Sequence, residues 1–237
     1  MIKLIKEYKT IIFDCDGVVL NSNKIKTDAF YEVTKHFGHE IAQSFVDYHV
    51  SNGGVSRYEK FRYFITQILK KPFNKVLNEE LLKHYAKYVK ESLIGAEVAE
   101  GLDILKAKNP KANWLIVSGS DQNELQEIFK SLNLYKYFEG GIFGSPDDKN
   151  TILKRELKSK NIKKPALFFG DSKYDYLVSK KANLDFVFLS AWSEVKNYKT
   201  WCNRNKISFT YHILENMGWR NWEKELKPIS IETEEKD

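Results

Sequence analysis

Two aspartates, Asp14 and Asp16, stand two positions apart directly after the apolar run Thr10–Phe13. Residues two apart in an extended segment start on the same side of the chain, so these carboxylates lie close together. Adjacent carboxylates repel each other unless a cation or a shared proton offsets their charge, and an oxygen-preferring dication such as Mg²⁺ can do so. Alone, the pair indicates either a metal site or a loop-capping feature.

Polar residues that could act with this pair follow other apolar runs. Ser118 follows Trp114–Val117 and precedes Asp121–Leu132, a segment with helical spacing. Its hydroxyl, the main-chain N–H groups after it and a helix N-terminus would together suit an anion, although Ser118 could also be a helix N-cap. Lys149 comes shortly after Gly141–Phe143 and would supply a cation, whereas a typical lysine simply lies at the surface.

A second pair of carboxylates, Asp171 and Asp175, follows the apolar run Ala166–Phe169. The two residues are four apart across a strand-to-helix turn, so both could face one site; alternatively, one is an exposed acid in the first helical turn. Two carboxylate pairs, a hydroxyl and a lysine suit phosphoryl transfer. One carboxylate attacks phosphorus, Mg²⁺ and lysine offset negative charge, and N–H donors hold the phosphate oxygens.

Short apolar runs alternate along the chain with segments of helical spacing. The runs are Thr10–Phe13, Trp114–Val117, Gly141–Phe143, Ala166–Phe169 and Phe186–Leu189. This alternation predicts an α/β fold, a doubly wound parallel sheet covered by helices on both faces. Ligands bind such a sheet beyond the carboxyl ends of its strands, where the polar residues gather.

The alternation breaks in the stretch from about Ser22 to Leu93. This stretch has no convincing strand, and its helix-like runs are Ala29–Phe37, Phe45–Val50, Tyr58–Leu69 and Glu80–Ser92. We therefore expect a core formed by 1–21 and 94–237, with an all-helical insertion over 22–93. Its place directly after Asp16 favours a lid over the end of the sheet, and the alternative is a packing module away from the site.

Four segments, taken in order, resemble the signature motifs of the haloacid dehalogenase (HAD) superfamily of phosphatases and phosphomutases. The segments are Asp14–Val19, Val117–Ser120, Gly144–Lys149 and Gly170–Asp175. The resemblance covers about residues 10–190, and the insertion is similar in position to the helical cap of the phosphoglucomutase-like branch. It implies a Rossmann-like core, a Mg²⁺ cofactor and an aspartyl-phosphate intermediate.

The resemblance also implies a role for each matching residue. Asp14 would be the nucleophile and Asp16 the general acid/base that protonates the leaving alcohol and then activates water. Ser118 and Gly119 would bind the transferring phosphate, while Lys149 would stabilise that phosphate and the Asp14 carboxylate.

The implied metal site combines side-chain and main-chain oxygens. Asp171 would bind Mg²⁺ together with the Asp14 carboxylate and the Asp16 main-chain carbonyl, and Asp175 would be a ligand or would orient the metal's waters. The presence of Asp16 argues against the dehalogenases themselves, which lack this second aspartate.

One cap segment, Gly54–Arg57, is similar to a Gly-x-Ser-Arg segment of the phosphoglucomutase-like branch. The arginine of that segment reaches the distal phosphate or sugar of the substrate, so Arg57 is a candidate for substrate specificity. An alternative for the same segment is a helix-capping box formed by Ser56 and Glu59, and the two interpretations are compatible.

We therefore expect a Mg²⁺-dependent phosphatase acting on a small phosphorylated metabolite, a sugar or sugar-acid phosphate. A sugar phosphomutase is the first alternative, although Lys26 stands where mutases of this branch carry histidine. Further alternatives are a phosphonate-cleaving enzyme with Lys24 or Lys26 as a Schiff base, a non-catalytic binding module, and an Asp-x-Asp glycosyltransferase. Ser118, Lys149 and Asp171 would have no role in a glycosyltransferase.

The composition supports a globular, cytoplasmic protein. Of the 237 residues 42% are apolar and 30% charged, which permits a real core and argues against a disordered or collagenous chain. The apolar runs are far shorter than the roughly 20 residues that span a bilayer, so we expect no membrane partner. The net charge of +6 comes from 38 basic and 32 acidic residues that are intermixed, which argues against a nucleic-acid partner.

Few other features carry chemistry. Cys15 and Cys202 have no metal-ligand spacing and are expected to be free thiols. The aromatic-rich C-terminal region is expected to pack on the core, with a dimer interface as the alternative; its tryptophans are Trp192, Trp201, Trp219 and Trp222. The charged tail Glu232–Asp237 is expected to be disordered.

Overall fold

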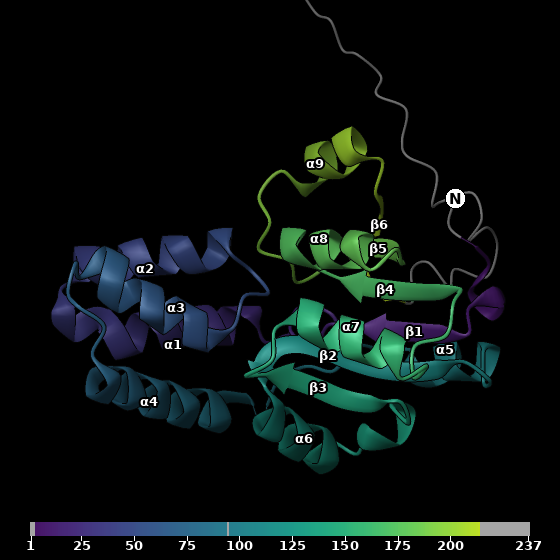
Figure 1. Cartoon of the computed structure of the whole chain (residues 1–237), viewed down its shortest axis with the longest axis horizontal. Coiled ribbons are helices and arrows are strands. Elements are labelled where there is room, and N and C mark those ends of the chain that lie inside the picture. The colour runs from purple at the N-terminus through teal and green to yellow at the C-terminus, as the bar shows by residue number, and fades with distance from the viewer. Residues whose placement is uncertain (1–2, 94, 214–237) are drawn as a thin grey trace, which may run out of the picture.

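A six-stranded parallel sheet forms the centre of the computed structural model, which describes residues 3–93 and 95–213 (Figure 1). The strands are β1 (Thr10–Phe13), β2 (Asn113–Asp121), β3 (Gly141–Ser145), β4 (Ala166–Gly170), β5 (Asp185–Leu189) and β6 (Ser208–Thr210). Their order is β3-β2-β1-β4-β5-β6, so the chain moves outward from β1 on one side and then on the other. The predicted doubly wound α/β fold is confirmed, and its topological switch point lies at β1.

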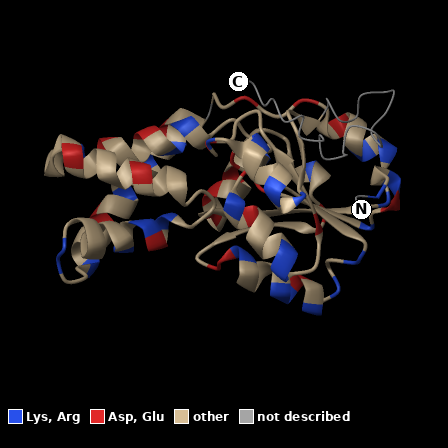
Figure 2. Ribbon diagram, turned by 90° about the horizontal axis from the view of Figure 1, so that it is seen from above, with Lys and Arg blue, Asp and Glu red and all other residues tan. Residues whose placement is uncertain are grey.

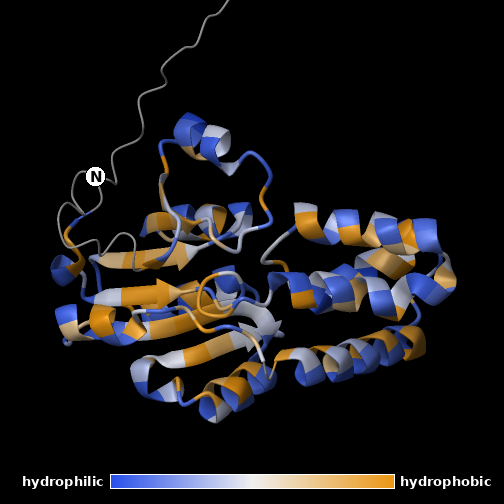
Figure 3. Cartoon of the chain, turned by 180° about the vertical axis from the view of Figure 1, so that it is seen from behind, coloured by the Kyte–Doolittle hydropathy of each residue, from blue (hydrophilic) through white to orange (hydrophobic). Residues whose placement is uncertain are grey.

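The alternating side chains of β1 explain why both faces of the sheet are covered. Ile11 and Phe13 belong to one buried cluster, which includes residues of the helices α5 and α6, whereas Ile12 belongs to a second cluster with residues of α7, α8 and α9. The bounds are α5 (Leu102–Lys108), α6 (Gln122–Ser131), α7 (Lys149–Lys158), α8 (Lys173–Lys181) and α9 (Tyr198–Asn205). Burial on both faces makes the central strands continuously apolar, as Figure 3 shows.

The insertion is a helical cap with its own core, and it lies beyond the carboxyl ends of the strands (Figure 1). Its helices are α1 (Asn23–Thr34), α2 (His39–Ser51), α3 (Arg57–Tyr63) and α4 (Lys75–Leu93), with a 3-10 turn at Lys35–Phe37 and a π-helical turn at Phe64–Ile68. The predicted all-helical character is confirmed. The bounds 22–93 for the cap stay a prediction.

The observed elements extend beyond the apolar runs that predict them. Helix α1 begins at Asn23 instead of Ala29, because its first turns are polar and contribute no apolar periodicity. Strand β2 continues past Val117 to Asp121, with a register shift against β3 between these two residues. Strand β6 is absent from the sequence-based expectation because it has only three residues.

The remaining sequence-based expectations concern thiols, aromatic residues and charge. Cys15 and Cys202 are buried free thiols, as predicted. Trp192 and Trp201 pack against the two core clusters, whereas Trp219, Trp222 and the tail lie outside the described residues. Figure 2 shows basic and acidic residues intermixed over both the cap and the core.

In the part of the chain that the structure describes, no helix combines the length and the apolar character needed to cross a membrane.

The aromatic core of the cap generates a stability prediction. Phe45 is fully buried and contacts the rings of Phe30, Phe61 and Phe64 at centroid distances of 5.2, 5.6 and 4.7 Å. We expect Phe45→Ala to lower the free energy of unfolding by about 3–5 kcal/mol, because it leaves a cavity among these rings. Urea unfolding followed by circular dichroism measures this loss. Val76→Ala, at a position 65% exposed on α4, is the control; equal effects of both substitutions would contradict a separately packed cap core.

Candidate active site

Asp14 directly follows the last residue of β1 and lies beside the cap. Its main-chain N–H donates to the Phe169 carbonyl at 2.9 Å, so the β1–β4 ladder continues up to this residue. The turn that follows requires glycine, because Gly17 has a φ of +73° and a Cβ there would lie 2.2 Å from Asp171 Oδ2. This turn lets the Asp171 carboxylate approach the loop after β1 closely.

Lys149 lies between the carboxylates of Asp14 and Asp175. Its Nζ is 2.7 Å from Asp14 Oδ2 and 2.5 Å from Asp175 Oδ1, and its side chain has no exposed surface. The lysine is the first residue of α7, whose N-cap is Asp148. The alternative of an ordinary surface lysine is therefore wrong.

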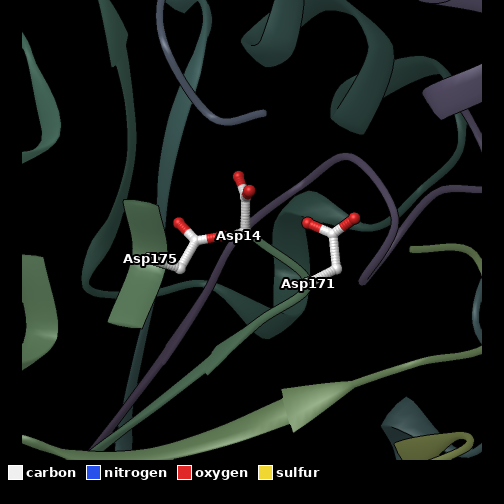
Figure 4. A group of neighbouring side chains, drawn as sticks. All are labelled: Asp14, Asp171 and Asp175. Carbon is white, nitrogen blue, oxygen red and sulfur yellow. The ribbon is translucent and has the colours of Figure 1, made fainter. Parts of the chain in front are cut away.

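Asp171 and Asp175 come from the turn between β4 and α8. Asp175 is fully buried and forms a capping box with Ser172, so it is not an exposed acid of the first helical turn. Asp171 Oδ2 accepts a hydrogen bond from Asn23 Nδ2 at 2.6 Å. Figure 4 shows the carboxylates of Asp14, Asp171 and Asp175 grouped together, and an oxygen from each lies within 4.8 Å of the others.

The charge balance of this group favours a divalent cation. Burial, together with the neighbouring carboxylates, raises the pKa of Asp14 to about 7 even though Lys149 lowers it. Burial and the charges of Asp14 and Asp175 raise the pKa of Asp171 well above its usual value. Three buried carboxylates share one lysine, so their full ionisation requires further positive charge, and their oxygens are the ligands that Mg²⁺ prefers.

Asp16 has a different environment from Asp14. Its Oδ1 accepts from Ser22 Oγ and Lys26 Nζ, both at 2.5 Å, and its Oδ2 accepts from Ser120 Oγ at 2.7 Å. Burial opposes ionisation, but the charge and hydrogen bonds of Lys26 outweigh it and hold the pKa of Asp16 below its usual range. The surroundings thus shift the pKa values of the two aspartates of the first motif in opposite directions, as is common for paired catalytic carboxylates.

Ser118 and Gly119 lie in the extended end of β2, not at a helix start. Helix α6 begins at Gln122 and its N-cap is Asp121, so the N-cap alternative for Ser118 is wrong. Ser118 is fully buried, and its Oγ accepts from Ser120 N at 3.1 Å. Gly119 lies against the cap, since a Cβ there would come 2.4 Å from the Gly54 carbonyl oxygen.

Arg57 connects the cap to the core. Its guanidinium bonds both carboxylate oxygens of Glu124 on α6, at 2.8 and 2.6 Å, and its carbon lies 4.7 Å from the centre of the Tyr85 ring. Ser56 caps α3 by accepting from the Glu59 N–H at 3.4 Å, which confirms its capping role. Arg57 also lines the cavity between cap and core, where it could contact a substrate. Its role in substrate specificity stays a prediction.

A cavity of about 60 Å³ lies between the cap and the carboxyl ends of the strands. Asp14, Asp16, Gly119 and Asp171 line it from the core, whereas Arg57 lines it from the cap. The cap therefore covers the site, which agrees with the lid interpretation and not with a remote packing module. Other lining residues were not identified from the sequence: Asn23, His49, Lys60, Ser120 and Glu194. They come from separate elements with no shared spacing, so the sequence offers no signal for them.

The comparisons with known proteins agree with this geometry. Residues 11–189 match the model of the haloacid dehalogenase-like hydrolases. The chain belongs to this family. A curated relative of this HAD hydrolase is the phosphorylated carbohydrates phosphatase of Thermotoga maritima, 25% identical over 190 residues that cover 76% of this chain and 84% of the relative. The family and this phosphatase relative support the expected enzyme class, a phosphomonoester hydrolase.

Solved structures show the same fold. A predicted phosphatase from Clostridium acetobutylicum superposes with a TM-score of 0.68 and 17% identity, over 90% of this chain and 97% of that one. A β-phosphoglucomutase from Clostridium difficile superposes with a TM-score of 0.64 and 18% identity, over 77% of this chain and 85% of that one. The fold, including the helical cap, is thus shared with a phosphatase and a mutase.

The raised pKa values predict a pH-dependent effect of Mg²⁺ on stability. Protons held by Asp14 and Asp171 stabilise the ion-free fold at low pH, and the contribution of Asp14 is lost as the pH rises through its raised pKa of about 7. Mg²⁺ would bind the ionised carboxylates, so its stabilising effect should grow over the same range. We expect the Mg²⁺-induced rise in unfolding temperature, measured against EDTA by differential scanning fluorimetry, to be larger at about pH 8 than at about pH 5.5.

Asp171→Asn is the informative variant for this measurement, because it removes one ionisable oxygen donor from the group. Its Mg²⁺-induced shift should be smaller than that of the unaltered protein. A shift of equal size at both pH values would contradict binding of the cation by these carboxylates.

Proposed function

We propose that this HAD hydrolase is a Mg²⁺-dependent phosphatase that hydrolyses a small phosphorylated metabolite, a sugar or sugar-acid phosphate, through an aspartyl-phosphate. The observation that carries the proposal is the setting of Asp14. Its Oδ2 lies 2.7 Å from Lys149 Nζ, its Oδ1 accepts from the Cys15 N–H at 2.7 Å, and it lines the same cavity as Asp16. A carboxylate held in one orientation beside a cation is suited to attack phosphorus.

The reaction has two displacement steps. An Asp14 oxygen forms a bond to phosphorus while the ester P–O bond breaks, and Asp16 in its protonated form gives a proton to the leaving oxygen. Because Lys26 favours the ionised form of Asp16, this role requires Asp16 to take up a proton before the first step. Asp16 then removes a proton from water, which attacks phosphorus and breaks the bond to Asp14. Products are the alcohol, inorganic phosphate and the original Asp14 carboxylate.

The surrounding residues would hold the phosphate and the cofactor. Ser118 and Gly119 are the proposed phosphate-binding residues, with Lys149 offsetting negative charge on the phosphate and on Asp14. Bound Mg²⁺ would offset further charge on the transferring group. Asp14, Asp171 and the Asp16 main-chain carbonyl are the proposed ligands, and Asp175, whose oxygens contact Lys149 and Ser172, would be a further ligand or would orient the metal's waters.

Two observations support the substrate class. The Thermotoga relative is described as acting on phosphorylated carbohydrates. The cavity between cap and core is small, about 60 Å³, and charged side chains such as Asp14, Asp16 and Arg57 line it, which favours a compact, polar substrate.

The decisive assay measures phosphate release from aryl, sugar, sugar-acid and nucleoside monophosphates, with Mg²⁺ and with EDTA. We expect release to require Mg²⁺ and to fall by about 10³-fold or more in Asp14→Asn, because the nucleophile is lost. Asp16→Asn should fall by about 10²–10⁴-fold, the usual contribution of a general acid/base. Asp28→Asn, which removes a half-exposed cap carboxylate paired with Lys24, is the matched control and should retain the activity.

Other outcomes of this assay separate the alternatives. A bisphosphorylated intermediate with little phosphate release would indicate a mutase. Binding of these phosphates with no turnover would indicate a non-catalytic module. Full activity of Asp14→Asn would contradict the proposed nucleophile.

A further inference from the structure

The cap side of the cavity carries three basic residues with different partners. Lys26 is paired with Asp16 at 2.5 Å, and Arg57 is paired with Glu124 at 2.6 Å. Lys60 on α3 is 2% exposed, and no carboxylate oxygen of the described residues lies within 4.0 Å of its Nζ. Lys60 therefore has a buried ammonium group that faces the cavity without a direct counter-charge.

The polar partner of Lys60 is a neutral histidine. Lys60 Nζ lies 2.7 Å from His49 Nδ1, and His49 Nε2 lies 3.1 Å from Thr27 Oγ1, which donates to Glu194 Oε1 at 2.7 Å. An ammonium group can only donate, so Nδ1 accepts and Nε2 carries the proton. Burial and the charge of Lys60 lower the pKa of His49 well below its usual value, which agrees with a neutral ring.

The other charged groups near Lys60 do not neutralise it. Lys26 adds repulsion, whereas Glu194 and Asp16 attract the ammonium group from beyond 4.0 Å. Glu194 lies in the loop after β5 and is bridged to Lys60 by His49 and Thr27. Burial is the main reason that the pKa of Lys60 falls to about 7. The Lys60 Nζ also lies 5.5 Å from the centre of the Phe30 ring, a cation–π contact that only partly offsets the cost of burying the charge.

We propose that Lys60, oriented by His49, binds a second acidic group of the substrate, a carboxylate or a second phosphate. This inference rests on the proposed function, because the substrate phosphate occupies the Asp14 end of the same cavity. An acidic group beside Lys60 would supply the missing counter-charge and form charge-assisted hydrogen bonds with the ammonium group. The substrate class is therefore a compact phosphate ester that carries another anionic group.

Matched pairs of phosphate esters test this proposal. Each pair differs only in the second group: 3-phosphoglycerate against glycerol 3-phosphate and 6-phosphogluconate against glucitol 6-phosphate for a carboxylate, and fructose 1,6-bisphosphate against fructose 6-phosphate for a second phosphate. We expect kcat/KM for the acidic member of at least one pair to exceed that of its neutral partner by about tenfold or more. The preferred pair identifies the acidic group.

Substitutions of Lys60 test whether a preference for the acidic esters depends on this residue. Lys60→Met should lower the acidic-to-neutral ratio of kcat/KM by about tenfold, and Lys60→Arg, which keeps the charge, should retain part of it. Lys24→Met is the control, because Lys24 is an 82%-exposed cap lysine, and its ratio should match that of the unaltered protein. Circular dichroism and the unfolding temperature establish whether each variant is folded.

Failure of this inference can be told apart from failure of the proposed function. Calorimetric binding of the same pairs to Asp14→Asn needs no turnover, so an acidic preference there supports the subsite even if no ester is hydrolysed. Hydrolysis with equal kcat/KM within every pair overturns the subsite and leaves the phosphatase proposal standing. An unchanged ratio in folded Lys60→Met also overturns it, and if that variant does not fold, the pairs and Lys60→Arg still decide.

Discussion

The ion pairs of Lys149 with Asp14 and Asp175 are the interaction on which the site depends. Both carboxylates are buried, and removing the lysine would leave them without compensation, which costs about 3–5 kcal/mol for a buried pair. The three residues follow three different strands, and only the parallel sheet brings them together. The stability of the fold and the proposed chemistry therefore depend on the same charges, and a cation of the kind that the three carboxylates favour would complete the charge balance.

The cap takes part in the charge distribution of the site as well as covering it. Lys26 lowers the pKa of Asp16, Asn23 donates to Asp171, and Arg57 pairs with Glu124 on the core. A hydrolytic enzyme must admit substrate and water at different stages, and lid movement is a common solution. In this protein Lys26 lies on the cap helix α1 and Asp16 on the loop after β1, so the cap contributes directly to the electrostatics of the proposed acid/base.

The buried ammonium group of Lys60 is energetically unfavourable within the otherwise apolar core of the cap. The cap core around Phe30 and Tyr85 is aromatic and well packed, yet it includes an ammonium group with only a neutral histidine as its polar partner. An unfavourably buried charge is expected at a binding site that must present this charge to its ligand. The same physical cost that lowers the pKa of Lys60 would favour an incoming anion.

The sequence alone determined the sheet, the helical insertion and the main acidic residues, because continuous apolar strands and polar strand ends leave a readable pattern. It identified Asp14, Asp16, Lys149, Asp171 and Asp175, whose spacing follows the strand-to-helix turns. Only the tertiary structure showed which polar side chains pack together. Asp121, not Ser118, caps α6, and Arg57 pairs with Glu124. Lys60 and His49 meet at the cavity. These contacts join separate elements, and hydrophobic periodicity carries no information about which polar side chains meet when a cap closes on a core.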